Sequence, residues 1–254
     1  MLSSFRLTFE VSRDQWSKLL QSRHRPLIKE YGVAILDTRD IDKFTERSDL
    51  HQLISTRHYS TRPLGRRRPP TTTRECVFAN TNQVDQDEFP SIIAKSLRVR
   101  DAKSSSPGTC VRNIAIVGHS VKRDLRIFQR LGIDVLGIAP LVIILDTHNM
   151  ARDVLGPTST RLSGRAPISR LTLAAVLAEI GCHHGENELH NAGNDATYTL
   201  FALIALAIRS SQARVLRDHE LAKLEHLIRI TASRRLSIQQ PSTLHPKLYD
   251  SLKS

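Results

Sequence analysis

The chain is poor in aromatic side chains and in cysteine. Phe, Trp and Tyr make up 5% of its 254 residues, which argues against a surface that holds nucleic acid chiefly by stacking bases on aromatic rings. The three cysteines, Cys76, Cys110 and Cys182, are odd in number and widely spaced, so a disulfide framework is not expected and a reducing compartment is favoured. If the chain binds nucleic acid, we expect it to contact the backbone.

Long apolar runs and acidic residues are also in short supply. No apolar run reaches the length of a membrane span. Lys and Arg outnumber Asp and Glu by 37 to 25, for a formal net charge of +12, which favours polyanionic partners, nucleic acid before membrane. We therefore expect RNA or DNA as the partner and no membrane, and the oligomeric state is left open.

The apolar content suffices for one domain with extensions. Hydrophobic residues make up 40% of the chain, enough for a sizeable core. We divide it into an N-terminal arm (1–30), a domain (31–212) and a C-terminal helix and tail (213–254). The opening segment hints at a mitochondrial transit peptide, but Glu10 and Asp14 interrupt it. Cytoplasm or nucleus is favoured, and the mitochondrion stays open.

Hydrophobic periodicity predicts an α/β fold with a mixed sheet. Strands are expected at 5–11, 31–37, 50–60, 74–79, 113–119 and 141–145. Helices are expected at 16–20, 85–97, 121–131, 147–155, 168–180, 194–210 and 213–230. The strands at 50–60 and 74–79 would pair as a hairpin, with a basic, proline-rich loop between them. The predicted order is a meander of strands followed by alternating helix and strand.

Three carboxylates stand where elements begin or end. Asp37 closes the strand at 31–37, Asp124 lies in the first turns of the helix at 121–131, and Asp195 opens a late helix five residues after His190. Carboxylates delivered to one edge of a sheet make an oxygen-rich site suited to Mg²⁺ or Mn²⁺. Two such ions can promote phosphodiester hydrolysis while a neutral, mobile His190 takes the proton from the attacking water. This set of residues is typical of a nuclease.

The carboxylates stand in motifs that resemble those of the DEDDh exonucleases, the DnaQ-like branch of the ribonuclease H-like superfamily. In that family the first strand carries Asp-x-Glu, the second motif carries His with a metal-binding Asp five residues later, and the third is His-x-x-x-x-Asp. Here Leu36-Asp37-Thr38-Arg39 corresponds to the first motif, His119 with Asp124 to the second, and His190 with Asp195 to the third.

The resemblance covers roughly residues 31–212 and implies a ribonuclease H-like fold, an antiparallel meander followed by parallel strands with flanking helices. It implies that Asp37, Asp124 and Asp195 bind Mg²⁺ or Mn²⁺ and that His190 is catalytic. The stretches at 118–125 and 190–196 are similar to a little-characterised fungal branch of these exonuclease-like proteins.

Arg39 stands where the family has the glutamate of its first motif. Residues two apart on a strand share a face, so a permanent cation is expected beside Asp37, where it opposes metal binding by several kcal/mol at an effective dielectric of roughly 20. We hypothesise that Arg39 forms a salt bridge with Asp124 or Asp195 and leaves a nucleic-acid-binding pseudoenzyme. The alternative is that Arg39 turns outward, Asp40 or another acid substitutes, and the chain is an active 3′ to 5′ exonuclease.

Other residues have both a functional and a structural interpretation. Asp195 taken alone is an ordinary helix cap, and His119 and Asp146 are expected to be structural, the latter as a cap. A second alternative function is that of an adaptor, with the helix at 213–230 and its leucines (Leu216, Leu221, Leu224 and Leu227) as a docking surface. The candidate contacts to a nucleic-acid backbone are Arg66, Arg67, Arg68, Lys122 and Arg123.

Overall fold

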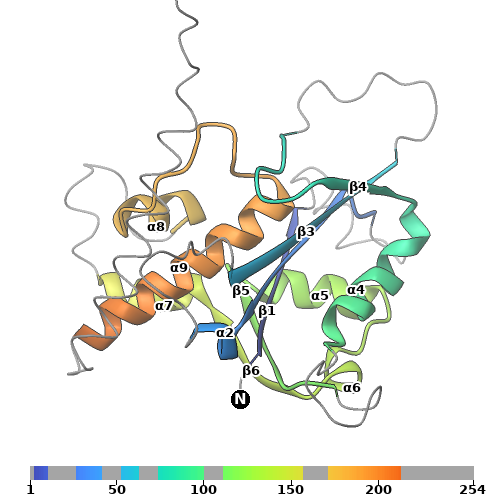
Figure 1. The fold of residues 1–254 in the computed structure, drawn as a ribbon, viewed down its shortest axis with the longest axis horizontal. Coiled ribbons are helices and arrows are strands. Elements are labelled where there is room, and N and C mark those ends of the chain that lie inside the picture. Colours follow the sequence, from blue (N-terminus) through green and yellow to red (C-terminus); the bar gives the residue numbers. More distant parts are fainter. Residues whose placement is uncertain are drawn as a thin grey trace, which may run out of the picture.

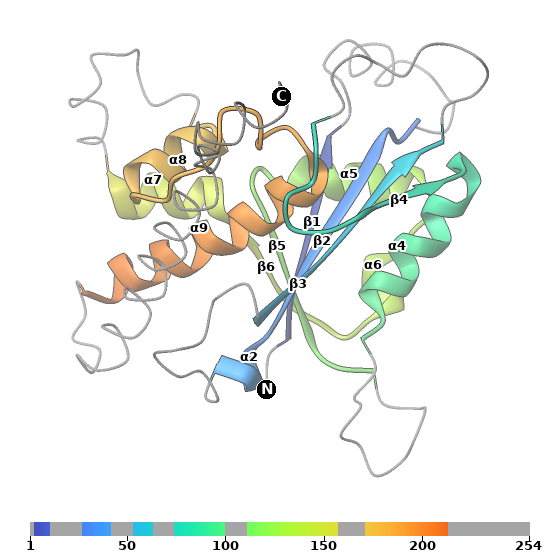
Figure 2. The ribbon, with the colours of Figure 1, turned by 45° about the horizontal axis from the view of Figure 1, so that its top comes forward.

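The computed structural model describes residues 3–10, 27–41, 53–62, 74–99, 111–156 and 171–212. Figure 1 draws the fold and Figure 2 gives a second view. Three predicted segments lie outside the described residues. They are the helix at 16–20, the part of the basic loop that holds Arg66, Arg67 and Arg68, and the C-terminal helix and tail from 213 onward.

A mixed sheet of six strands forms the centre of the fold, in the order β4-β3-β2-β1-β5-β6. The strands are β1 (Ser3–Glu10), β2 (Glu30–Asp37), β3 (Ile54–Thr61), β4 (Thr81–Val84), β5 (Ile114–Gly118) and β6 (Leu141–Asp146). β1, β2 and β3 form an antiparallel meander, and β5 and β6 extend the sheet parallel to β1. The predicted α/β class and ribonuclease H-like arrangement are confirmed.

Helices cover both faces of this sheet (Figures 1 and 2). One face carries α7 (Thr147–Leu155), α8 (Leu173–Glu179) and α9 (Ala192–Gln212). The other carries α4 (Phe89–Leu97), which follows the 3₁₀ helix η1 (Gln86–Glu88), together with α5 (Lys122–Arg130) and α6 (Val135–Ile138). The short α2 (Thr38–Ile41) follows β2. None of the described helices combines the length and apolar character that crossing a membrane requires.

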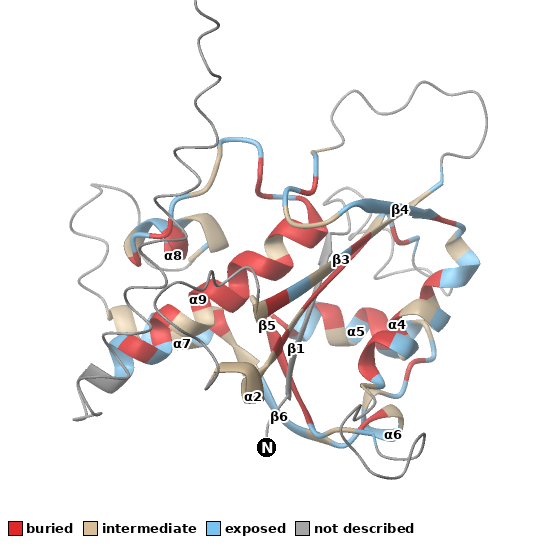
Figure 3. Cartoon of the chain, in the orientation of Figure 1, coloured by how far each residue is buried: buried red, intermediate tan, exposed pale blue. Residues whose placement is uncertain are grey.

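Each face of the sheet has its own apolar cluster, because successive side chains of a strand point to opposite faces. In β2, Ala34 and Leu36 join the cluster under α9, whereas Tyr31 and Val33 join the one under α4 and α5. All of β5 is buried, as Figure 3 shows. Burial on both faces explains why β2 and β5 appear in the sequence as continuous apolar runs rather than as alternating patterns.

Most predicted helices are confirmed, with small changes at their ends. α5 and α8 are each followed by a glycine in the left-handed region, Gly132 (φ 74°) and Gly181 (φ 73°). α8 begins at Leu173, later than predicted, because the side chain of Thr172 caps it by accepting a hydrogen bond from Ala175 N at 3.2 Å.

Two predictions about strands are wrong. Residues 3–10 are not an arm outside the domain, since β1 lies within the sheet between β2 and β5, and the predicted boundary at residue 31 falls inside it. The segment Arg74–Ala79 forms no strand; β4 begins only at Thr81, and it pairs with β3 in parallel rather than as a hairpin. The reason is that the side chain of Asn194, in the third motif, forms hydrogen bonds with the backbone of Glu75 and Val77.

Candidate functional site

The third motif forms the entry to α9. Asn191 is the cap of the helix, since its Oδ1 accepts hydrogen bonds from Gly193 N at 3.0 Å and Asn194 N at 3.1 Å. Asp195 reaches back, and its Oδ1 accepts a hydrogen bond from the backbone N–H of His190 at 3.1 Å. His190 has a φ of 68°, so the chain turns sharply before the helix. The two motif residues are therefore held together by the helix entry itself.

Asn194 fastens a distant segment to this entry. Its buried side-chain amide donates hydrogen bonds to the carbonyls of Glu75 (2.9 Å) and Glu188 (2.8 Å) and accepts one from Val77 N (2.9 Å). The side chain of Asn194 thus pairs with backbone groups of Glu75 and Val77 that would form hydrogen bonds with a neighbouring strand if this segment were a strand. This explains why the stretch at 74–79 is not a strand, although its composition predicts one.

The first turn of α9 rests on β2. Ala192 N donates a hydrogen bond to Glu30 Oε2 at 3.1 Å. Gly32 permits the approach, because a Cβ at this position would lie 2.1 Å from Ala192 O and 2.4 Å from Gly193 N. Both obstructing atoms belong to the backbone, so they have little freedom to yield. Glycine is needed here for close contact between two backbones.

His58 of β3 lies beneath the same turn and is buried. Its Nδ1 is 2.8 Å from Thr81 Oγ1, and its Nε2 is 3.4 Å from Asn191 Nδ2 and 3.6 Å from Glu30 Oε2. Sequence reasoning missed both His58 and Glu30. The signal that could have found them is a polar residue within or beside a strand whose neighbours are otherwise buried.

Asp124 of the second motif lies in the first turn of α5 and is buried. Its sequence neighbours Lys122 and Arg123, both predicted to contact nucleic acid, are exposed. α5 and α9 both contact β1 and cover opposite faces of the sheet. The helices of the second and third motifs therefore flank the same strand.

His119 and Asp146 have the structural roles predicted for them. The ring of His119 is held at both nitrogens, with Nδ1 3.1 Å from Thr147 Oγ1 and Nε2 2.9 Å from the carbonyl of Leu171. Asp146 caps α7 by accepting a hydrogen bond from His148 N at 3.0 Å. Both residues also connect the start of α7 to the end of β5, since Asp146 Oδ1 accepts a hydrogen bond from Ser120 N at 2.9 Å.

Asp37 lies at the opposite end of the sheet from the third motif. The register pairs Asp37 with Ser3 at the start of β1, and Ser3 with Ile114 at the start of β5. Glu30, under the first turn of α9, is at the other end of β2, roughly 20 Å away at ~3.3 Å per residue. The prediction that Asp37 shares a site with the other motifs is wrong. An antiparallel strand ends where its neighbours begin.

Two arginines enclose the carboxylate of Asp37. Arg39 donates to it from its backbone N (3.0 Å), Nε (3.1 Å) and Nη2 (2.8 Å), and Arg112 donates from Nη2 (3.0 Å) and Nη1. The guanidiniums of Arg112 and Arg39 hold the pKa of Asp37 well below its usual range.

This arrangement corrects the interpretation of Arg39. The residue lies in α2 rather than on a strand and binds Asp37, so the hypothesised salt bridge with Asp124 or Asp195 is wrong. Arg112 was missed by sequence reasoning, and no local pattern singles it out. The two arginines and Asp37 form a structural ion cluster.

β1, and not β2, is the strand that lies beside β5 and runs parallel to it. It ends in Thr8-Phe9-Glu10, and Glu10 pairs with Glu30, on which the first turn of α9 rests. The strand itself was predicted at 5–11, but its end was not recognised as a candidate site position. The available signal was the alternation of apolar residues through Leu7 and Phe9, closed by a carboxylate.

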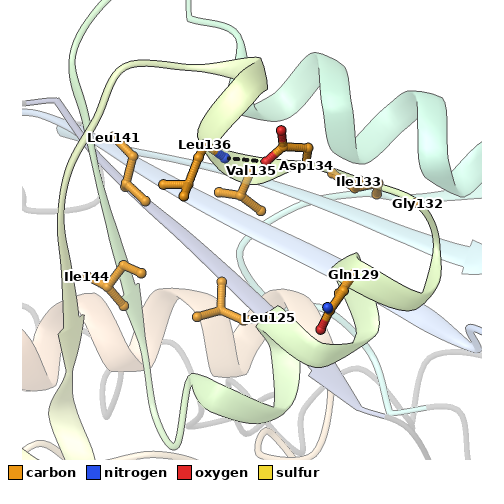
Figure 4. A pocket seen from close by; sticks show the side chains of 9 residues that line it. All are labelled: Leu125, Gln129, Gly132, Ile133, Asp134, Val135, Leu136, Leu141 and Ile144. Carbon is orange, nitrogen blue, oxygen red and sulfur yellow. Dashed lines mark hydrogen bonds between the residues drawn. The ribbon is translucent and has the colours of Figure 1, made fainter.

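The described side chains do not fit a two-metal site. Within the described ranges there is no group of three or more His, Cys, Asp and Glu residues that could hold a metal ion, and the carboxylate of Asp37 is taken up by guanidiniums. A pocket of about 490 Å³ lies elsewhere, between α5, α6 and β6 (Figure 4). Its walls are mainly apolar, and the cluster of residues around it belongs to the face opposite α9.

The comparison with protein families decides the relationship. A family model described as the C-terminal domain of DNA polymerase III subunit epsilon-like proteins, DEDDh_C, matches residues 20–206. The chain belongs to this DEDDh exonuclease-like family. The match includes the second and third DEDDh motifs and begins after β1. A comparison with curated proteins gives no match. The link to a fungal branch stays a prediction.

Proposed function

We propose that this DEDDh domain binds nucleic acid and is a weak or inactive nuclease, because its first motif is degraded at Thr8 rather than at Arg39. The observation that carries the proposal is the position of β1, which is the first strand of the sheet and lies parallel to β5. In the family the first strand carries Asp-x-Glu. The last residues of β1 are Thr8-Phe9-Glu10, so the glutamate is retained and threonine replaces the aspartate.

Loss of this aspartate weakens a site for divalent cations. Mg²⁺ and Mn²⁺ bind best to anionic oxygen ligands, and a threonine hydroxyl is neutral. The family generally depends on divalent metals, so a first motif that lacks its aspartate would hold them poorly. His190, the candidate proton acceptor, is kept in place by the bond between its backbone and Asp195.

Binding of nucleic acid is supported by charge and position. Lys122 and Arg123 are exposed in the turn of α5 that also carries Asp124, and the chain has a net charge of +12. Phosphates are the natural partners of such groups. Contacts by Arg66, Arg67 and Arg68, which lie outside the described residues, stay a prediction, as does the adaptor function of the helix at 213–230.

A nuclease assay on the full chain tests the proposal. Release of mononucleotides from the 3′ end of labelled RNA and DNA would be measured with Mg²⁺ and with Mn²⁺. We expect little release by the natural sequence and at least a tenfold increase in Thr8→Asp, because that change restores the missing carboxylate. Thr8→Asn is the matched control, because the asparagine side chain is as large as that of aspartate but carries no charge. Arg39→Glu is expected to give no gain.

Binding is measured in parallel by fluorescence anisotropy of the same oligonucleotides. Metal-dependent release by the natural sequence that disappears in Asp195→Asn would favour the alternative, an active 3′ to 5′ exonuclease. If Arg39→Glu increased nuclease activity and Thr8→Asp did not, the first motif would lie at the end of β2 rather than at the end of β1. An absence of any nucleic-acid binding would refute the proposal.

A further inference from the structure

The exposed surface of α5 is almost wholly basic. Lys122, Arg123, Arg126 and Arg130 are exposed, and the helix's only acidic residue, Asp124, is buried. Lys122, Arg126 and Arg130 are spaced four residues apart, so they form a row along one side of the helix. Successive cations of this basic row are about 6 Å apart along the axis, at 1.5 Å per residue. The row begins in the turn that carries Asp124.

This arrangement does not serve the stability of the helix. Lys122 lies in the first turn, where the helix dipole disfavours a cation, and like charges four residues apart repel each other. No ion pair joins Lys122, Arg126 or Arg130 to a carboxylate in the part of the chain that the structure describes. Arg130 lies in the last turn, where the dipole favours a cation, but the repulsion along the row is offset by no ion pair among the described residues. Such a row of like charges points to a role in binding.

We propose that the basic row of α5 binds the phosphate backbone of a nucleic-acid strand that passes the turn bearing Asp124. The inference rests on the proposed function and extends it, because it assigns Arg126 and Arg130 to the interface and gives the strand a direction along α5. Cations repeated along one side of a helix can contact several phosphates of one nucleic-acid backbone.

An anionic membrane is the other polyanion that a basic helix could meet. Helices that bind membranes bury their apolar side among the lipids. The apolar side of α5 is already used, since Ile127 and Phe128 are buried in the protein. The remaining flank, Leu125 and Gln129, faces the pocket between α5 and β6 (Figure 4). The basic row therefore shares no exposed face of α5 with apolar side chains of the same helix, which favours phosphates over lipids. Exposed apolar side chains do lie nearby on α6 and β6 (Leu136, Val142, Ile143 and Ile144), so a membrane surface is one outcome that the test distinguishes.

The test is the salt dependence of binding to a single-stranded DNA and to a single-stranded RNA of 20 nucleotides. The natural chain is compared with the triple variant Lys122→Gln, Arg126→Gln and Arg130→Gln. Each lost phosphate contact lowers the slope of log K against log salt by about 0.7, so the slope should fall by about 2 and the affinity at low salt more than tenfold. Thermal unfolding confirms that the variant is folded.

Arg152→Gln is the matched control, because Arg152 is exposed on α7, on the other face of the sheet. The salt slope of this variant should equal that of the natural chain. If the natural chain binds but the triple variant keeps its slope, the basic row is not an interface and the proposed function stands. If the natural chain does not bind at all, the proposed function fails and this inference with it. Binding to phosphatidylserine vesicles is measured as well. If the triple variant loses binding to the vesicles but keeps binding to DNA and RNA, α5 is a membrane surface instead.

Discussion

Asp37 lies opposite Ser3 in the ladder between β1 and β2, at the end of the sheet where β1 begins. A carboxylate that closes a buried strand is typical of a site residue, but here two guanidiniums bind it. Its contribution is therefore to stability. The end of β1 near Glu10 lies by the third motif instead, because Glu10 pairs with Glu30 under α9.

Asp37→Asn should destabilise the protein at neutral pH. The pKa of Asp37 is lowered in the folded state by Arg112 and Arg39, so the ionised carboxylate stabilises the fold above its unfolded pKa, about 3.9. The variant leaves two guanidiniums facing each other and should lower the free energy of unfolding by about 2 kcal/mol at pH 7. Urea unfolding measures the difference.

The pH dependence of that difference is the more specific result. The contribution of Asp37 is lost as the pH falls below about 4 toward the depressed folded pKa, so the gap between the natural chain and Asp37→Asn should narrow there. Asp153→Asn is the control, because Asp153 is exposed on α7 and lies 3.9 Å from Arg152, a surface pair with little effect. A gap that stays constant with pH would contradict the ion cluster.

Gly32→Ala should loosen the third motif. The new Cβ would meet the backbone of Ala192 and Gly193, which cannot move without shifting the start of α9. We expect a loss of about 1–3 kcal/mol in the free energy of unfolding and faster hydrogen exchange at residues 190–195. In the control Gly137→Ala, the Cβ meets only the side chain of Asp134, at 2.5 Å from its carboxylate. Moving that side chain weakens the cap of α6 but shifts no backbone, so the loss should be smaller. An equal loss in both would rule out this account.

Asn194→Ala should be among the more harmful polar substitutions. It removes the hydrogen bonds to Glu75 O, Glu188 O and Val77 N and leaves these backbone groups without their partner at a buried position. The expected loss is about 3 kcal/mol in chemical denaturation. Asn149→Ala is the control, because Asn149 is exposed on α7 and its side chain accepts a hydrogen bond from the exposed Arg152. Its effect should stay within about 0.5 kcal/mol. If Asn194→Ala and Asn149→Ala lowered the free energy of unfolding by similar amounts, the hydrogen bonds of Asn194 would contribute little to stability.

Local patterns predicted much of the fold. The runs that became β2 and β5 are apolar because both faces are covered. The period of α5 follows from its one-sided burial, whereas the first half of α9 is buried nearly all round and is therefore a continuous apolar run. The third motif was also predicted correctly as the entry to α9, since the residues from His190 to Asp195 interact within a single turn. Interactions between near neighbours in sequence can be read from the sequence.

Arg112 and the segment at 74–79 mark the limit of such reasoning. Arg112 reaches Asp37 across the sheet, and Asn194 holds Val77 from the start of a distant helix. Neither contact leaves a periodic signal, because the partners are far apart in the chain. Propensity alone predicted a strand at 74–79, and tertiary hydrogen bonds prevented it.

The sequence by itself determined most of the strands and helices, though not the segment at 74–79, and it determined that a DEDDh motif opens α9. Only the tertiary structure decided which strand is the first of the sheet and which end of it each carboxylate occupies. Asp37 and Glu10 both close a strand, but β1 and β2 run in opposite directions, so their ends lie at opposite edges. Strand direction is set by pairing between distant segments, and no local pattern encodes it.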